Sequence, residues 1–214
     1  MSFNLRKELP SLVIVAFPFL YLYYIWDELP AKVPLHWNVK GEIDRWGDKE
    51  ELFYIPILLP LLVYIIFLII PLIDPKKQLD KMGRKYHSFK LILTLSMSMI
   101  TLFILFTAKD SSLSSPNYIF IIIGVMFTLI GNFMKTIKPN YFIGIKTPWT
   151  LESEAVWKST HLFAGKLWFI GGLVIVLQSL LLPNSIVPVV FVIITLIITF
   201  TPIIYSYVQF KKQK

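Results

Sequence analysis

Three histidines are the side chains best suited to acid–base or metal chemistry, and the chain has no cysteine beside them. Without cysteine there is no disulfide, no thiol nucleophile and no thiolate metal ligand. His36 precedes Asp44 by eight residues, so the two could form a partial metal site or an acid–base pair. Two ligands are too few for zinc, and we favour a local hydrogen bond between His36 and a turn at Gly41. We therefore expect no metal ion and no cofactor.

Other arrangements that support catalysis are weaker still. Glu50 and Glu51 are adjacent and face apart, whereas Glu152 and Glu154 are placed to stabilise the N-terminus of a helix. His161 lies on a tryptophan-rich helix end, where a hydrogen-bonded interface residue is commoner than a catalytic base. The sequence has no Gly-x-Ser-x-Gly elbow and no phosphate-cradling loop. These observations favour a protein that binds its partners and is not an enzyme.

Long apolar runs position all of these residues. The chain of 214 residues is 56% hydrophobic and only 16% charged, against about 25% charged for a soluble domain. A membrane span needs about 20 apolar residues. Six runs lack Asp, Glu, Lys and Arg: 9–26, 52–73, 91–108, 113–134, 167–182 and 185–210. We predict an all-α integral membrane protein with about six transmembrane helices. The absence of charge within the runs argues against a proton-coupled pump or an ion channel.

The basic residues predict the orientation of these spans. Of the 21 Lys and Arg residues, 16 lie in the two termini and in the connections 74–90 and 135–166. The connections on the opposite side hold the other 5. Cytoplasmic loops carry the excess of Lys and Arg, so both termini are expected in the cytoplasm. His36 then lies outside while His87 and His161 lie inside, so the three cannot converge. The net charge of +8 indicates topology and contact with anionic lipid and gives no reason to expect direct nucleic-acid binding.

The outer segment 27–51 has the pattern of a short hairpin. Val33, Leu35 and Trp37 alternate with polar neighbours, as in a half-buried strand. Residues 39–42 are a turn candidate, and residues 43–46 can return as a second strand. We expect a β-hairpin-like loop on the membrane surface, packed on the ends of the spans because an isolated hairpin is marginal in water.

The inner segment 135–163 is rich in aromatic residues. Pro139 and Pro148 are expected to interrupt any helix and to keep residues 138–149 extended. Thr150 or Ser153 can then cap a helix that runs on into the fifth span. Two compatible interpretations stay open. The segment either seals the bundle at the membrane interface or forms a recognition surface for a cytoplasmic partner.

Two groups of residues carry a resemblance to a known family. Residues 131–173 resemble the C-terminal signature of the SdpI family of bacterial membrane proteins. The matching or neighbouring candidates are Asn132, Asn140, Gly144, Lys146, Thr147, Pro148, Trp149, Trp157, Thr160, His161 and Gly165. The residues His36, Trp37, Asn38, Gly41 and Asp44 resemble the small domain of unknown function that precedes this signature. Leu162 departs from the pattern, because the family often has a basic residue there. We accordingly expect an N-terminal two-helix unit, 1–75, and a four-helix unit, 76–214.

The resemblance implies a function. SdpI-like proteins protect the producing cell from a secreted peptide toxin, and they hold a small cytoplasmic repressor at the membrane. The resemblance implies a multi-pass protein of the bacterial cytoplasmic membrane. Its partners would be the lipid bilayer, a toxin outside and a repressor inside. Residues 30–46 would receive the toxin, and residues 138–161 would couple to the cytoplasm. Two alternatives stay open: a small transporter of an uncharged or lipidic substrate, and a membrane enzyme acting on lipid-linked precursors through His36 and Asp44.

Overall fold

A computed structural model describes residues 4–38, 43–75, 77–110 and 117–213. Within these residues six helical segments are long and apolar enough to cross a membrane. They are α1 (Leu5–Ile25), a broken second span that ends in α3 (Leu62–Ile73), α4 (Arg84–Lys109), α5 (Asn117–Met134), α7 (Glu154–Leu181) and α8 (Val187–Lys211). The prediction of an all-α, multi-pass membrane protein with six spans is confirmed.

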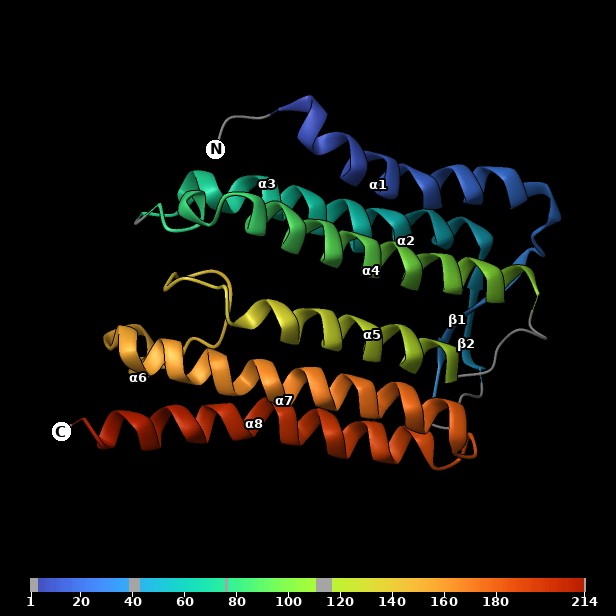
Figure 1. Cartoon of the computed structure of the whole chain (residues 1–214). Helices are drawn as coiled ribbons and strands as arrows, with labels where there is room; N and C mark the ends of the chain where they lie inside the picture. Colours follow the sequence, from blue (N-terminus) through green and yellow to red (C-terminus); the bar gives the residue numbers. More distant parts are fainter. Residues whose placement is uncertain (1–3, 39–42, 76, 111–116, 214) are drawn as a thin grey trace.

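The six spans lie side by side in two groups (Figure 1). Helices α1, α3 and α4 form one group and α5, α7 and α8 the other, with α4 in contact with α5. The start of α1, the start of α4 and the end of α8 lie at the same end of the bundle, which we call the terminal end. The small sheet lies at the opposite end, the hairpin end. That the terminal end faces the cytoplasm stays a prediction.

Pro60 makes the second span irregular. The span begins with a 3₁₀ turn, η2 (Lys49–Phe53), and continues as α2 (Tyr54–Pro56), a π-helical turn, η3 (Ile57–Leu61), and α3. Pro60 has no N–H to donate to the carbonyl of Pro56, and its ring crowds that carbonyl. The ladder widens locally to the i→i+5 pattern instead. The span therefore stays continuous but irregular near the hairpin end.

The predicted hairpin is present as β1 (Lys32–Trp37) paired antiparallel with β2 (Ile43–Asp48). The register is irregular around Leu35, where the pairing shifts between Pro34 and His36. Val33 is fully buried in a cluster with Leu105 and Ala108 near the end of α4. This contact supplies the packing that an isolated hairpin lacks. The predicted turn at residues 39–42 lies outside the described residues.

Glycines allow α5 and α7 to approach closely. A Cβ added at Gly165 would lie 2.8 Å from the carbonyl oxygen of Gly131, and one added at Gly172 would lie 2.5 Å from that of Gly124. On each helix the two glycines are seven residues apart, so they share one face. Small residues serve this purpose in membranes, where backbone proximity provides much of the packing energy.

The connection from α5 to α7 contains a short helix that the sequence reasoning did not predict. Helix α6 (Pro148–Glu152) begins at the proline that was expected to interrupt any helix. That expectation is wrong because the first helical position needs no N–H donor and favours the fixed φ of proline. Ser153 then caps α7 through the N–H of Val156, 3.3 Å from its hydroxyl, and α7 runs unbroken into the fifth span as predicted.

Candidate functional site: the two ends of the bundle

The signature segment at the terminal end is held by Asn140. Its side-chain oxygen accepts the backbone N–H groups of Phe142 at 2.8 Å and Ile143 at 2.7 Å. Its amide nitrogen donates to the carbonyls of Lys138 at 2.7 Å and Ile143 at 3.0 Å. Asn140 is only 2% exposed. One buried amide thus satisfies backbone groups that have no helix or sheet partner in this stretch.

Gly144 and His161 form the next contact of the segment. The backbone N–H of Ile145 donates to His161 Nε2 at 3.0 Å, and His161 Nδ1 lies 2.8 Å from the carbonyl of Trp157. A carbonyl only accepts, so Nδ1 carries a proton. Nε2 accepts the N–H of Ile145 and carries none, so the imidazole is neutral. Gly144 has a φ of 108°, and a Cβ there would overlap His161 Nε2. Both ring nitrogens are therefore occupied by structural hydrogen bonds.

Hydroxyl groups tie the segment to α8. Thr147 caps α6 by accepting the N–H of Thr150 at 3.2 Å, while the N–H of Thr147 donates to the hydroxyl of Thr150 at 2.9 Å. The Thr147 hydroxyl also lies 3.0 Å from that of Ser206 in α8. Trp149 packs at a tilt on Tyr207, with ring centroids 4.9 Å apart. The motif Thr-Pro-Trp-Thr is thus a helix cap fastened to the last span.

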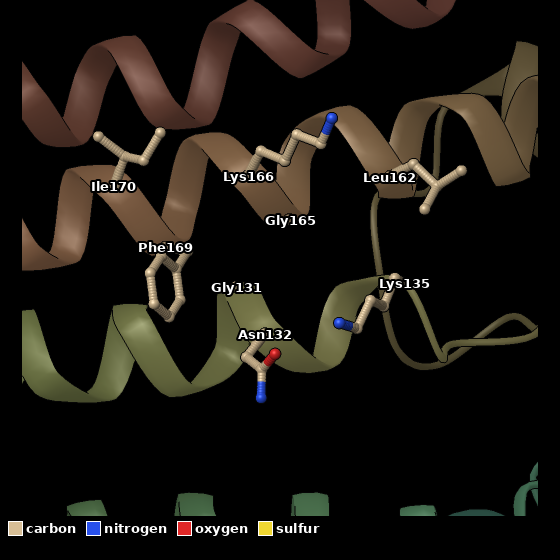
Figure 2. A pocket seen from close by; sticks show the side chains of 8 residues that line it. All are labelled: Gly131, Asn132, Lys135, Leu162, Gly165, Lys166, Phe169 and Ile170. Carbon is tan, nitrogen blue, oxygen red and sulfur yellow. The ribbon is translucent and has the colours of Figure 1, made fainter.

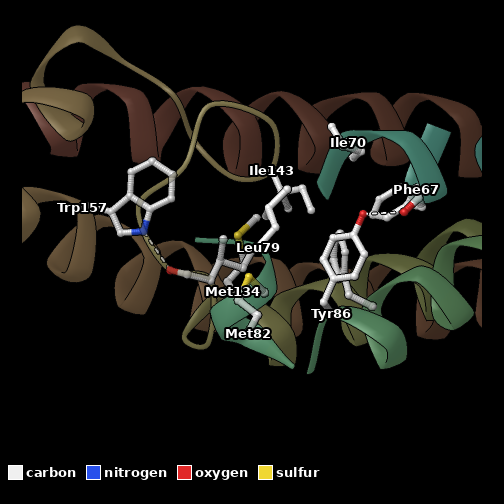
Figure 3. Close-up of a cluster of buried hydrophobic side chains, with 10 residues drawn as sticks. Phe67, Ile70, Leu79, Met82, Tyr86, Met134, Ile143 and Trp157 are labelled. Atoms are coloured by element: carbon white, nitrogen blue, oxygen red, sulfur yellow. Dashed lines mark hydrogen bonds between the residues drawn. The ribbon is translucent and has the colours of Figure 1, made fainter. Parts of the chain in front are cut away.

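Trp157 joins the segment to the core below it. Its indole N–H donates to the carbonyl of Ile137 at 2.8 Å, and Figure 3 shows this bond beside the one from Tyr86 to Phe67. Ile137 and Ile143 belong to the same buried cluster, which reaches α3 through Phe67. Most polar groups of the signature therefore act inside the protein. The Thr160 hydroxyl is an exception, because it is buried and has no partner in the described part of the chain.

Lysines surround the part of the signature that stays exposed. Lys146 donates to the carbonyls of Tyr141 at 3.2 Å and Phe142 at 3.1 Å, yet its side chain remains exposed. A cleft of about 270 Å³ reaches Trp157 and His161. Its charged lining consists of Lys85, Lys135, Lys138, Lys158 and a single acid, Glu154. We call this the lysine cleft. Its charge suits an acidic partner.

A second hollow lies between α5 and α7. Its volume is about 340 Å³ (Figure 2). The close approach at Gly131 and Gly165 forms its floor, and Asn132, Lys135 and Lys166 give it a polar border. Leu162, Phe169 and Ile170 make the rest apolar. Of the signature candidates, Asn132 and Gly165 thus line this groove and take no part in the hydrogen bonds described above.

At the hairpin end, His36 is paired with Asp44 across the two strands. Its Nδ1 lies 2.5 Å from Asp44 Oδ1, and the His36 side chain is 65% exposed. His36 Nδ1 is thus paired with a carboxylate. We had favoured a hydrogen bond between His36 and the turn at Gly41, but Gly41 lies outside the described residues. Asn38 is half-buried, and Trp37 belongs to β1.

Two further ion pairs fasten the hairpin. Lys32 lies 2.8 Å from Asp48, and Arg45 lies 2.8 Å from Glu51. The hydrogen bond to Asp48 raises the pKa of Lys32 above its ordinary value. No group of three or more His, Cys, Asp or Glu side chains that could hold a metal occurs among the described residues.

A buried charge pair that was not predicted from the sequence joins two helices of the first group. Glu8 is 3% exposed and Lys90 is 2% exposed. Lys90 Nζ donates to Glu8 Oε2, and the Tyr64 hydroxyl donates to the same oxygen at 3.0 Å. His87 Nδ1 lies 3.6 Å from Glu8 Oε1. Glu8 and Lys90 each lie one residue before an apolar run, 9–26 and 91–108. Extending the predicted helices beyond the starts of these runs would have placed both charges on spanning helices.

The apolar runs themselves hold no charge, but Glu8 and Lys90 lie on the helices that contain two of those runs. Helix α1 begins at Leu5 and α4 at Arg84, so both charges lie within spanning helices. Lys158 and Lys166 likewise belong to α7. All four charges lie outside the six apolar runs, so the expectation against a proton-coupled pump or an ion channel, which rested on those runs, is unchanged.

The fold defines a multi-pass helical protein of the cell membrane, with a small sheet at one end of the bundle and a buried polar connection at the other. Comparison with known proteins narrows this class. The SdpI/YfhL protein family matches residues 136–206, and the domain of unknown function DUF1648 matches residues 13–59. The SdpI/YfhL match includes most of the signature region 131–173, so the predicted resemblance to the SdpI family is confirmed.

Two known proteins are similar to the chain. The chain is 26% identical over 208 residues to Immunity protein SdpI of Bacillus subtilis, covering 97% of this chain and 98% of that protein. Over 65 residues it is 37% identical to an uncharacterized protein of Archaeoglobus fulgidus, covering 29% of this chain and 36% of that one. No solved structure matches the chain. The division into units 1–75 and 76–214 stays a prediction.

Proposed function

We propose that the chain is a non-catalytic immunity protein of the bacterial cytoplasmic membrane that protects its cell from a secreted peptide toxin. The observation that carries the proposal is the similarity to Immunity protein SdpI, which extends over 97% of the chain. The similarity therefore includes the hairpin, the spans and the signature together. Both termini face the cytoplasm in this proposal, because 16 of the 21 basic residues then lie inside.

The hairpin is the proposed receiving site for the toxin. Segment 27–51 holds seven acids and four basic residues, so it attracts a basic peptide. Trp46 is 55% exposed on β2 and offers the aromatic anchor that binding sites favour. The buried Val33 fixes this surface to the end of α4. A rigid, acidic and aromatic platform of this kind needs no catalytic group.

The lysine cleft is the proposed holding site for a small cytoplasmic repressor. Four lysines around one acid favour an acidic partner segment. The hydrogen bonds of Asn140 and His161 keep the backbone beneath this surface in one conformation. Replacing Lys135 and Lys158 by glutamine removes two charges of the cleft, whereas the same change at Lys211 and Lys212 removes two charges elsewhere at the terminal end. Only the first variant should release the repressor from the membrane fraction.

Survival of a toxin-sensitive bacillus without its own immunity gene tests the function. Cells that express the chain are challenged with an Sdp-type peptide toxin, and membrane insertion is verified by fractionation. We expect survival of cells with the parent chain and death of cells with an empty vector. Death of cells that hold the inserted protein would refute the immunity function.

A further inference from the structure

A cleft at the terminal end, between the first turns of α1 and α4, is separate from the signature. Its volume is about 590 Å³. The side chains that line it and can bind an anion are Arg6, Lys7, Arg84, His87 and Ser88. Pro10 and Gly83 complete the lining. The proposed functions of the hairpin and of the lysine cleft use none of these residues.

The charge in this cleft is not neutralised by neighbouring acids. In the described ranges no ion pair joins Arg6, Lys7 or Arg84 to a carboxylate. Glu8 is the acid beside them in sequence, but its carboxylate is buried and already accepts from Lys90 and Tyr64. Since Glu8 and Lys90 cancel, three positive charges remain around one hollow.

The residue types suit a phosphate group. Two guanidinium groups can each offer a pair of parallel N–H donors to phosphate oxygens. A lysine adds a point charge, and the Ser88 hydroxyl adds a donor. His87 borders the cleft and is near Glu8, so the ligand site and the buried charge pair share a side chain.

The surface beside the cleft indicates what is attached to the phosphate. Leu5, Leu9 and Val13 follow one another along α1 with exposed fractions of 62%, 55% and 59%. This strip runs from the cleft along a spanning helix, where acyl chains surround the protein. An anion that carries its own hydrocarbon tail fits both surfaces at once. Anionic phospholipids are such ligands, and they concentrate in the cytoplasmic leaflet.

We propose that this cleft binds the phosphate group of an anionic ligand, with an anionic phospholipid as the source that the apolar strip favours and a free phosphate compound as the other source. The bound phosphate joins α1 to α4 directly above the Glu8–Lys90 pair. It thereby holds the N-terminal helix in place at the membrane boundary.

Binding to the purified full-length chain tests the proposal. The protein is placed in nanodiscs of phosphatidylcholine, and phosphatidylglycerol or inorganic phosphate is titrated in while Tm and native mass spectra are recorded. We expect phosphatidylglycerol to raise Tm and to remain bound in the spectra. A response to inorganic phosphate that competes with the lipid supports the site with the soluble source. No response to either ligand overturns the proposal.

Charge-matched variants separate this site from general attraction to lipid. Arg6→Gln with Arg84→Gln should weaken lipid affinity at least about tenfold, as expected for loss of charge-assisted hydrogen bonds. Lys211→Gln with Lys212→Gln removes the same charge from the end of α8 and should leave the affinity within about twofold of the parent. Equal weakening in both variants overturns the proposal. If the double arginine variant does not fold, Arg84→Lys keeps the charge and should still weaken binding by removing the paired donors.

Discussion

Removing Lys90 alone should destabilise the protein more than removing both members of the buried pair. In Lys90→Met, the carboxylate of Glu8 stays buried at 3% exposure, and its remaining neighbours among the described residues are the Tyr64 hydroxyl at 3.0 Å and His87 Nδ1 at 3.6 Å. An uncompensated buried charge of this kind costs about 3–5 kcal/mol. In Glu8→Met with Lys90→Met no charge remains, and the main loss is the partner of Tyr64. That loss costs about 1–3 kcal/mol.

The assay is reversible unfolding in mixed micelles, with SDS as denaturant and circular dichroism as the signal. Lys85→Met is the control, because Lys85 lies five residues earlier on α4 and is exposed, and its effect should stay within about 0.5 kcal/mol. The double variant should be more stable than Lys90→Met. If Lys90→Met lies within about 1 kcal/mol of the parent, or if the double variant is the less stable of the two, the reasoning about this pair is refuted.

Three further perturbations test the packing and the two ends. Gly172→Leu should cost about 1–3 kcal/mol or more, because its side chain would overlap Thr128 on α5; SDS unfolding measures this, and a neutral result would contradict the close helix contact. Asn140→Ala should cost about 2–4 kcal/mol by leaving one buried and one partly buried N–H group without an acceptor. Limited proteolysis should then cut within 138–149, and Asn140→Asp should protect only in part, because it keeps the acceptor for the two N–H groups but loses the donor to the carbonyls of Lys138 and Ile143. Because Asp48 raises the pKa of Lys32, the stabilisation by their pair is complete below the unfolded-state pKa and is lost as pH rises through the folded-state value. Amide exchange is itself base-catalysed, so the measurement compares protection factors: those of the hairpin should fall at strongly alkaline pH in the parent, and an equal fall in Lys32→Met would contradict this role.

Features that depend on local pattern were predictable from the sequence. The spans follow from apolar length, and the hairpin follows from the alternation of Val33, Leu35 and Trp37. The cap of α7 was predicted at Thr150 or Ser153, and the structure has it at Ser153. Each of these signals lies within about 20 residues of chain.

Features that depend on contacts between distant residues were not predictable in the same way. Glu8 and Lys90 are 82 residues apart in sequence, and only the packing of α1 on α4 pairs them. The match of Gly124 with Gly172 requires the relative register of α5 and α7. The motif around Asn140 and His161 could be recognised in the sequence. Its side chains bond to the backbone of the same segment, and residue types alone do not predict these partners.

Direct binding of the toxin tests the central claim, which is protection by recognition at the hairpin without catalysis. The full-length chain in nanodiscs is incubated with labelled Sdp-type peptide toxin, and the bound toxin is then recovered for mass spectrometry. We predict saturable binding of intact toxin that is lost in Trp46→Ala. Binding should be kept in Leu181→Ala, which changes an exposed apolar residue elsewhere at the hairpin end. Cleaved toxin, or equal binding by the two variants, would contradict the account.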